Sequence, residues 1–116
     1  MIKRTSSYGG ILHEVVEHNG TLYLSGLVAD TLTPDIKAQT EDIMRQLQTL
    51  LRANGSDVDR VLQATVYLSD LSLKDGFNAV WKKTFAEAHL PARAAIGVAD
   101  LGKDVLVEMV LIAAKR

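Results

Sequence analysis

The sequence predicts an α+β fold, a two-layer sandwich in which two helices cover one face of a sheet. Two observations support this class: segments of period-two alternation that indicate strands, and two segments whose apolar residues recur three and four apart, as in amphipathic helices. In chain order the expected elements are β-β-β-α-β-α-β-β. The 116 residues fit a single domain spanning 1–116, because domains usually hold roughly 100 to 150 residues.

The first strands form a hairpin around Asn19-Gly20, since both residue types tolerate the positive φ angles of a type I′ turn. A long helix is expected next, with Asp35 as its N-terminal cap and Asn54-Gly55 as its C-terminal stop. Its apolar stripe consists of Ile36, Ile43, Met44, Leu47, Leu50 and Leu51.

The second half of the chain is expected to alternate between strands and a helix. A strand is predicted at 62–68, where Leu62, Ala64, Val66 and Leu68 alternate with other residues to form one apolar face. The second helix has an apolar stripe of Phe77, Val80, Trp81, Phe85 and Ala88, which we interpret as core, and Pro91 prevents its continuation. A short strand at 94–98 and a turn at 100–103 lead to the last strand, 105–114.

The last strand is apolar on both faces apart from Glu108. Two helices on one side of a sheet cover only one face, so we expect the other face to pack against copies of the same chain. An isolated buried carboxylate costs several kcal/mol, so Glu108 needs a partner or an open cleft. The alternative is an exposed glutamate without a role.

Arg93 is the candidate partner of Glu108, because it opens the preceding strand and lies fifteen residues earlier. An antiparallel pair joined through the Gly102 turn would bring the two side chains together, although the partner could equally lie on a neighbouring subunit. A guanidinium is also suited to bidentate capture of a small carboxylate. An ordinary surface salt bridge is the competing interpretation of Arg93.

Composition excludes several classes of function. A formal net charge of −1 provides no positive field for nucleic acid, and the absence of cysteine excludes disulfides and thiolate chemistry. His13, His18 and His89 lack the spacing of metal ligands, so no metal site is predicted. The sequence contains neither an apolar run long enough to span a membrane nor a signal sequence, and we therefore expect a cytoplasmic protein.

The chain resembles a known family in several blocks. The C-terminal part contains Pro91-Ala92-Arg93, the stretch Gly102-Lys103-Asp104-Val105-Leu106-Val107-Glu108, and Ile112-Ala113-Ala114-Lys115-Arg116. Upstream lie Ser25-Gly26, Asn54-Gly55-Ser56, Val66-Tyr67-Leu68 and Phe77-Asn78-Ala79-Val80-Trp81. In order and spacing, these blocks resemble the RidA family of reactive intermediate deaminases, also called YjgF-like proteins and formerly labelled endoribonuclease L-PSP.

This resemblance implies a chorismate-mutase-like fold that assembles as a homotrimer, with a central β-barrel and clefts between subunits. It also implies hydrolytic deamination of reactive 2-imino acids and their enamine tautomers, such as 2-aminoacrylate, to 2-oxo acids and ammonia. No cofactor is expected. The implied partners are a small-molecule carboxylate substrate and further copies of the chain.

The family's functional residues correspond to positions of this sequence. Its essential arginine corresponds to Arg93, which would bind the substrate carboxylate, and its acidic partner to Glu108, which would act on the attacking water. The implied substrate contacts are Ser25, Gly26, Asn78, Ala95 and Tyr8. Tyr8 is the tyrosine nearest to the position of a family tyrosine, which this chain fills with Leu12.

Other positions also depart from the family pattern. Leu27 stands where glutamine is common, Ala95 where many relatives carry cysteine, and Val110 where a second acidic residue is frequent. A more apolar cleft leaves open an alternative function, a trimeric binder or sensor of small carboxylate metabolites without turnover. RNA cleavage, which the older family label implies, fits poorly with the near-neutral charge.

Overall fold

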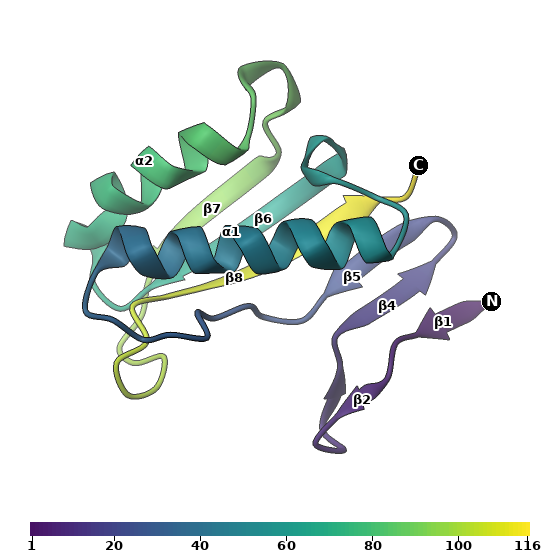
Figure 1. The fold of residues 1–116 in the computed structure, drawn as a ribbon, viewed down its shortest axis with the longest axis horizontal. Coiled ribbons are helices and arrows are strands. Elements are labelled where there is room, and N and C mark those ends of the chain that lie inside the picture. The colour runs from purple at the N-terminus through teal and green to yellow at the C-terminus, as the bar shows by residue number, and fades with distance from the viewer.

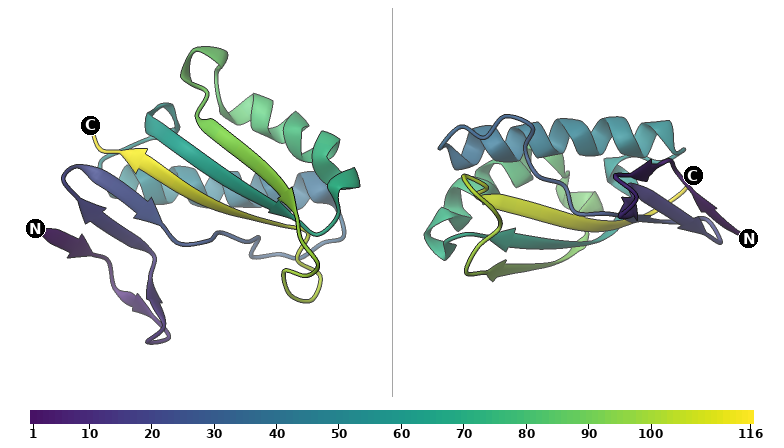
Figure 2. Two further views of the ribbon diagram at one scale, coloured as in Figure 1. Left: turned by 180° about the vertical axis from the view of Figure 1, so that it is seen from behind. Right: turned by 90° about the horizontal axis from the view of Figure 1, so that it is seen from below.

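The computed structural model describes residues 1–116 and contains a six-stranded sheet with two helices on one side, together with a two-stranded ribbon. The strands of the sheet are β1 (Ile2–Arg4), β4 (Val15–His18), β5 (Thr21–Leu24), β6 (Val61–Leu68), β7 (Ala92–Gly97) and β8 (Val107–Ala114). The helices are α1 (Ile36–Ala53) and α2 (Lys74–Thr84), and both cover the same face (Figures 1 and 2). The molecule is 20 Å thick, which matches one sheet and one layer of helices at about 10 Å each. The predicted α+β sandwich is confirmed.

The first hairpin and the long helix agree with the sequence prediction. Asn19 and Gly20 have φ angles of 52° and 77°, as a two-residue turn between β4 and β5 requires. The carboxylate of Asp35 accepts a hydrogen bond from the backbone N–H of Lys37 at 3.0 Å and caps α1. Gly55, with a φ of 77°, follows the end of that helix.

Local differences from the prediction concern the ends of elements. Leu62 does not face the core but is 51% exposed, because a bulge between Val61 and Gln63 shifts the register and buries Val61 instead. The second helix already ends at Thr84, so Ala88 is exposed within a short 3₁₀ turn, Glu87–His89.

Two further differences concern strands. A two-stranded ribbon of β2 (Ser7–Tyr8) and β3 (Leu12–His13), which the sequence did not predict, lies before β4 (Figure 1). The last strand begins at Val107 instead of residue 105, because the preceding turn includes Asp104 at a φ of 64°.

The strand order contradicts the predicted pairing of the last two strands. The order in the sheet is β1-β4-β5-β8-β6-β7, and β7 pairs only with β6, in parallel. The segment β6-α2-β7 is therefore a βαβ unit, in which the intervening helix returns the chain to the same end of the sheet. β8 then lies between β5 and β6, so the expected antiparallel hairpin through Gly102 is wrong.

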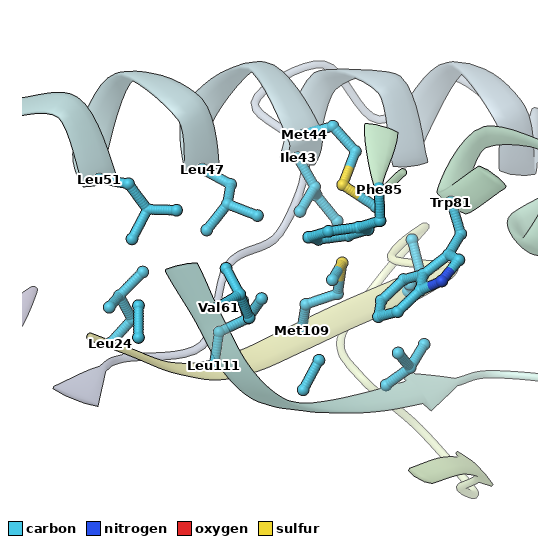
Figure 3. Packing of buried hydrophobic residues seen from close by; sticks show 14 of the residues in the cluster. Leu24, Ile43, Met44, Leu47, Leu51, Val61, Trp81, Phe85, Met109 and Leu111 are labelled. Atoms are coloured by element: carbon cyan, nitrogen blue, oxygen red, sulfur yellow. The ribbon is translucent and has the colours of Figure 1, made fainter. Parts of the chain in front are cut away.

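The core lies between the helices and the sheet (Figure 3). The side chains of α1 at Ile43, Leu47 and Leu51 are fully buried against the sheet. From the sheet side, β8 contributes Val107, Met109, Leu111 and Ala113, which alternate with residues that face the other way.

The second face of the sheet has no helix over it (Figure 2, right). By register, the side chains on that face include Tyr23, Thr65, Tyr67, Ala94, Ile96, Glu108, Val110 and Ile112. Tyr23 and Ile96 remain 45% and 43% exposed. We call this set the open face; it is predominantly apolar, as the sequence predicted for the last strand.

A buried amide joins α1 to the loop that leads into β8. Gln39 is 0% exposed; its Nε2 donates to the carbonyl oxygens of Thr33 (2.8 Å) and Asp104 (2.9 Å), and its Oε1 accepts from the backbone N–H of Leu106 (3.0 Å). Replacing this side chain leaves buried backbone groups without partners. We expect Gln39→Leu to lower the free energy of unfolding by about 3 kcal/mol in urea denaturation.

The matched control is Gln48→Leu, because Gln48 lies on the same helix but is only half-buried. It should change the free energy of unfolding by less than about 0.5 kcal/mol. Equal losses in the two variants would show that the buried hydrogen bonds of Gln39 contribute no particular stability.

Candidate functional site

Arg93 lies on the edge strand β7, on the face that the helices cover. Its register partner on β6 is Ala64, a fully buried residue of that face. The guanidinium donates from Nη1 to Oδ1 of Asn78 on α2 at 2.7 Å. Its central carbon lies 4.8 Å from the ring centroid of Trp81 and 5.8 Å from that of Phe77. The side chain is thus held by one in-plane hydrogen bond and by aromatic rings.

No carboxylate of the chain pairs with Arg93. The three salt bridges join Arg52 to Asp57, Lys115 to Glu17, and Arg116 to Asp59. Partial burial lowers the pKa of Arg93 from its ordinary value, although a guanidinium stays charged at any working pH. Within one chain, Arg93 therefore does not form the surface salt bridge that was the competing interpretation. An anion from outside the chain would compensate the positive charge of Arg93.

Glu108 lies on the open face, opposite Tyr67 of β6. The half-buried side chain packs closely against Gly26, where a Cβ atom would lie only 2.1 Å from Oε2 of the carboxylate. Gly26 is held there because Leu27 exchanges two backbone hydrogen bonds with Met109, at 2.8 and 3.0 Å. Glycine is therefore required at position 26 if Glu108 is to keep this orientation.

The expected pairing of Arg93 with Glu108 inside one chain is wrong. Arg93 faces the helices, whereas Glu108 faces the open side, and β6 separates their two strands. Successive side chains of a strand point to opposite faces, so neither side chain can reach around the sheet. The alternative that the partner comes from a neighbouring subunit remains.

Two of the predicted substrate contacts lie beside Glu108 and two beside Arg93. Gly26 touches Glu108, and Ser25 precedes it, although its hydroxyl already donates to the carbonyl oxygen of His13 at 2.7 Å. Asn78 binds Arg93 directly. Ala95, two residues after Arg93 on the same face, packs against the hydrophobic core. The predicted site residues of one chain therefore lie in two separate groups, which we call half-sites: one holds Ser25, Gly26 and Glu108, and the other holds Asn78, Ala95 and Arg93.

Tyr8 lies near the first of these half-sites, because it lines the same cavity as Ser25 and Gly26. It is 67% exposed and pairs across the ribbon with Leu12, the position that the resemblance matches to the family tyrosine. Directly opposed residues of an antiparallel pair have side chains on the same face, about 5 Å apart. Tyr8 therefore lies next to the position at which the family resemblance implies a tyrosine, a proximity that counting along the sequence did not reveal.

A cavity of about 670 Å³ lies between this half-site and α1. Tyr8, Ser25 and Gly26 line it, whereas neither Arg93 nor Glu108 does. On its α1 side, Asp42 accepts hydrogen bonds from the side chain of Gln46 and from the backbone N–H groups of residues 30 and 31. These bonds, that of Gln46 foremost, hold the pKa of Asp42 below its usual range.

Sequence reasoning missed the contact between Trp81 and Arg93. The apolar spacing of α2 predicts that its aromatic residues belong to the core, and Trp81 is only 6% exposed. A signal was present, because Asn78 and Trp81 are three residues apart on a predicted helix and therefore share a face. That both meet Arg93 depends on the parallel pairing of β7 with β6, which the sequence did not reveal.

No three side chains of histidine, aspartate or glutamate lie close enough together to hold a metal ion. Neither helix has the length and apolar character needed to cross a bilayer.

Comparison with known sequences defines the family. The sequence model of the family described as endoribonuclease L-PSP matches residues 2–115. The chain is 37% identical over 101 residues to the candidate regulator AldR of Lactococcus lactis, a match that covers 82% of this chain and 79% of that protein. It is 31% identical over 101 residues to the RutC family protein YoaB of Escherichia coli, covering 87% and 88% of the two chains.

Solved structures agree with this result. A crystal structure of a YjgF family member from Neisseria meningitidis superposes with a TM-score of 0.93 at 31% identity, over 100% of this chain and 96% of that one. The Rid family protein YyfA of Yersinia pestis gives a TM-score of 0.87 at 26% identity, over 96% and 93%. The fold is therefore that of the YjgF structures. The chain belongs to the RidA/YjgF family, as its sequence blocks predicted.

Proposed function

We propose that this chain hydrolyses reactive 2-imino acids and their enamine tautomers to 2-oxo acids and ammonia, as a homotrimer with its sites between subunits. Membership of the RidA/YjgF family supports this activity. The observation that carries the proposal is Arg93, a partly buried guanidinium held by Asn78 and aromatic rings without a carboxylate partner in its own chain. A substrate carboxylate supplies the missing anion through two charge-assisted hydrogen bonds.

The positions of the two half-sites support this assembly. Arg93 and Glu108 lie on opposite faces of the sheet and cannot meet within one chain. The apolar open face favours burial against other copies, and closing three sheets into a central β-barrel removes it from water. In this arrangement the Arg93 half-site of one copy faces the Glu108 half-site of its neighbour.

Glu108 then acts on water. Its carboxylate accepts a proton as the water oxygen bonds to the imine carbon, the electron pair of the C=N bond moves to nitrogen, and the protonated carboxyl group of Glu108 returns the proton to that nitrogen. In the resulting carbinolamine the C–N bond then breaks, the hydroxyl proton passes through Glu108 to the leaving nitrogen, ammonia departs, and the former hydroxyl oxygen becomes the carbonyl oxygen of the 2-oxo acid. Imines already hydrolyse in water, so fixing the carboxylate and orienting the water supply the acceleration.

The activity can be tested by competition for the imine. An amino-acid oxidase generates 2-imino acids, and semicarbazide traps whatever survives. We expect the parent protein to lower the trapping rate and Arg93→Ala to lose at least about 100-fold of this activity, because both hydrogen bonds to the substrate carboxylate disappear. Arg52→Ala, which removes an exposed arginine, should behave like the parent. An active Arg93→Ala trimer would refute the proposed role.

A second candidate function is a trimeric binder or sensor of small carboxylate metabolites without turnover. Two points favour it: the similarity to the candidate regulator AldR, and the apolar residues Leu12, Leu27 and Ala95 at positions where the family resemblance implies tyrosine, glutamine and cysteine. This function keeps Arg93 as the carboxylate receptor and needs no role for Glu108. Saturable binding of 2-oxo acids without any acceleration of imine hydrolysis would support it over the enzyme.

A further inference from the structure

Trp81, which lies beside the guanidinium of Arg93, is the only tryptophan of the chain. We infer that Trp81 is a positioning residue for Arg93 and that its fluorescence reports whether a carboxylate occupies that guanidinium. The inference rests on the proposed function, since it assigns to Arg93 the capture of a substrate or product carboxylate. It extends that function by naming the residue that fixes the guanidinium.

Two contacts restrict the guanidinium in different directions. Its central carbon lies 4.8 Å from the centroid of the indole, within the range at which a cation is attracted to an aromatic face. The hydrogen bond from Nη1 to Asn78 acts in the plane of the group. A guanidinium has five N–H donors, and this bond uses one of them within the chain. The remaining donors are free for an incoming carboxylate.

The indole itself is firmly held. Between ring centroids, the indole lies 4.3 Å from Phe85 (Figure 3) and 6.0 Å from Phe77, so the three rings form a continuous row. Asn78 and Trp81 lie three residues apart on the same helix, so both contacts with Arg93 come from one rigid element. The orientation of Arg93 is therefore prepared before a ligand arrives, which lowers the entropic cost of binding.

Phe85 provides a matched control. It is buried at 3% exposure and touches Trp81, but of the three aromatic rings only Phe77 and Trp81 lie near the guanidinium. Trp81→Leu and Phe85→Leu thus both remove a buried aromatic ring from the same row, and only the first removes the face next to Arg93. Trp81→Tyr keeps an aromatic face and should restore much of the lost affinity.

The first measurement is binding of pyruvate, a 2-oxo acid of the product class, by calorimetry under conditions where each variant is folded. We expect Trp81→Leu to weaken binding roughly 10-fold and Phe85→Leu less than about 2-fold, as loss of a cation–π contact at a partly desolvated site predicts. In the imine assay, Trp81→Leu should raise KM roughly 10-fold and change kcat little. Saturating pyruvate should change the emission of the parent but not of Arg93→Lys.

The outcomes separate this inference from the proposed function. If the parent binds pyruvate and Trp81→Leu loses affinity, but no imine is hydrolysed, the positioning role stands and the enzymatic function fails. If the parent hydrolyses imines while Trp81→Leu and Phe85→Leu weaken pyruvate binding equally, Trp81 is only a core residue and the inference is overturned. A parent protein that binds no pyruvate at millimolar concentration also overturns it.

Discussion

Mixing two severely impaired variants, Arg93→Ala and Glu108→Gln, is expected to restore about a quarter of the parent deaminase activity. In the proposed trimer each variant alone impairs every site, because each site needs both side chains. In a randomly mixed trimer, a site is intact when its arginine comes from a Glu108→Gln subunit and its glutamate from an Arg93→Ala subunit. Each condition holds for half of the subunits, which gives the quarter.

This expectation follows from the opposite faces on which Arg93 and Glu108 lie. If both residues of a site came from one chain, every mixed trimer would be as inactive as its components. Activity is measured after subunit exchange, which native mass spectrometry of the mixed trimers verifies independently.

The control mixes Arg93→Ala with Asn78→Asp. Asn78 binds Arg93 directly, so both substitutions damage the Arg93 half-site. Every subunit of this mixture carries one of them, so no interface of a mixed trimer contains an intact Arg93 half-site. This mixture should stay below the activity that the Glu108→Gln mixture recovers. Failure of the first mixture after complete exchange would contradict a site shared between subunits.

Gly26→Ala is expected to lower kcat on the order of 100-fold while leaving the thermal midpoint nearly unchanged. A Cβ at this position would lie 2.1 Å from Oε2 of Glu108, so the carboxylate has to move. The obstructing atom is the end of a flexible side chain, and Gly26 does not have the positive φ that penalises alanine, so the fold can adjust at little cost. A displacement of about 1 Å at a catalytic group is sufficient for such a loss.

The same substitution in a Glu108→Gln background is the appropriate comparison. If Gly26 acts by placing the carboxylate, the double variant should be no slower than Glu108→Gln alone, since the two changes then remove one function. Additive losses would show that Gly26 contributes to catalysis independently of Glu108. A fully active Gly26→Ala enzyme would show that the orientation of Glu108 seen here is not the productive one.

Local patterns of the sequence predicted the elements well, because they depend on neighbouring residues. The Asn19-Gly20 turn requires positive φ angles that these two residue types adopt, and α1 begins at a capping aspartate and ends before a glycine. The bulge between Val61 and Gln63 could not be predicted from the sequence of β6 alone. A bulge is an extra residue in one strand relative to its partner, so it depends on how β6 pairs with β8.

The sequence by itself determined the fold class and the family. It also singled out Arg93 and Glu108, because each is a charged residue in an otherwise largely apolar strand. Only the tertiary structure decided that they lie on opposite faces, because the parallel β6-α2-β7 crossover places β7 at the edge and β8 in the middle of the sheet. The same crossover brings Trp81 and Asn78 onto Arg93. Contacts of this kind join residues far apart in the chain through strand order, which the periodicity of a single segment does not encode.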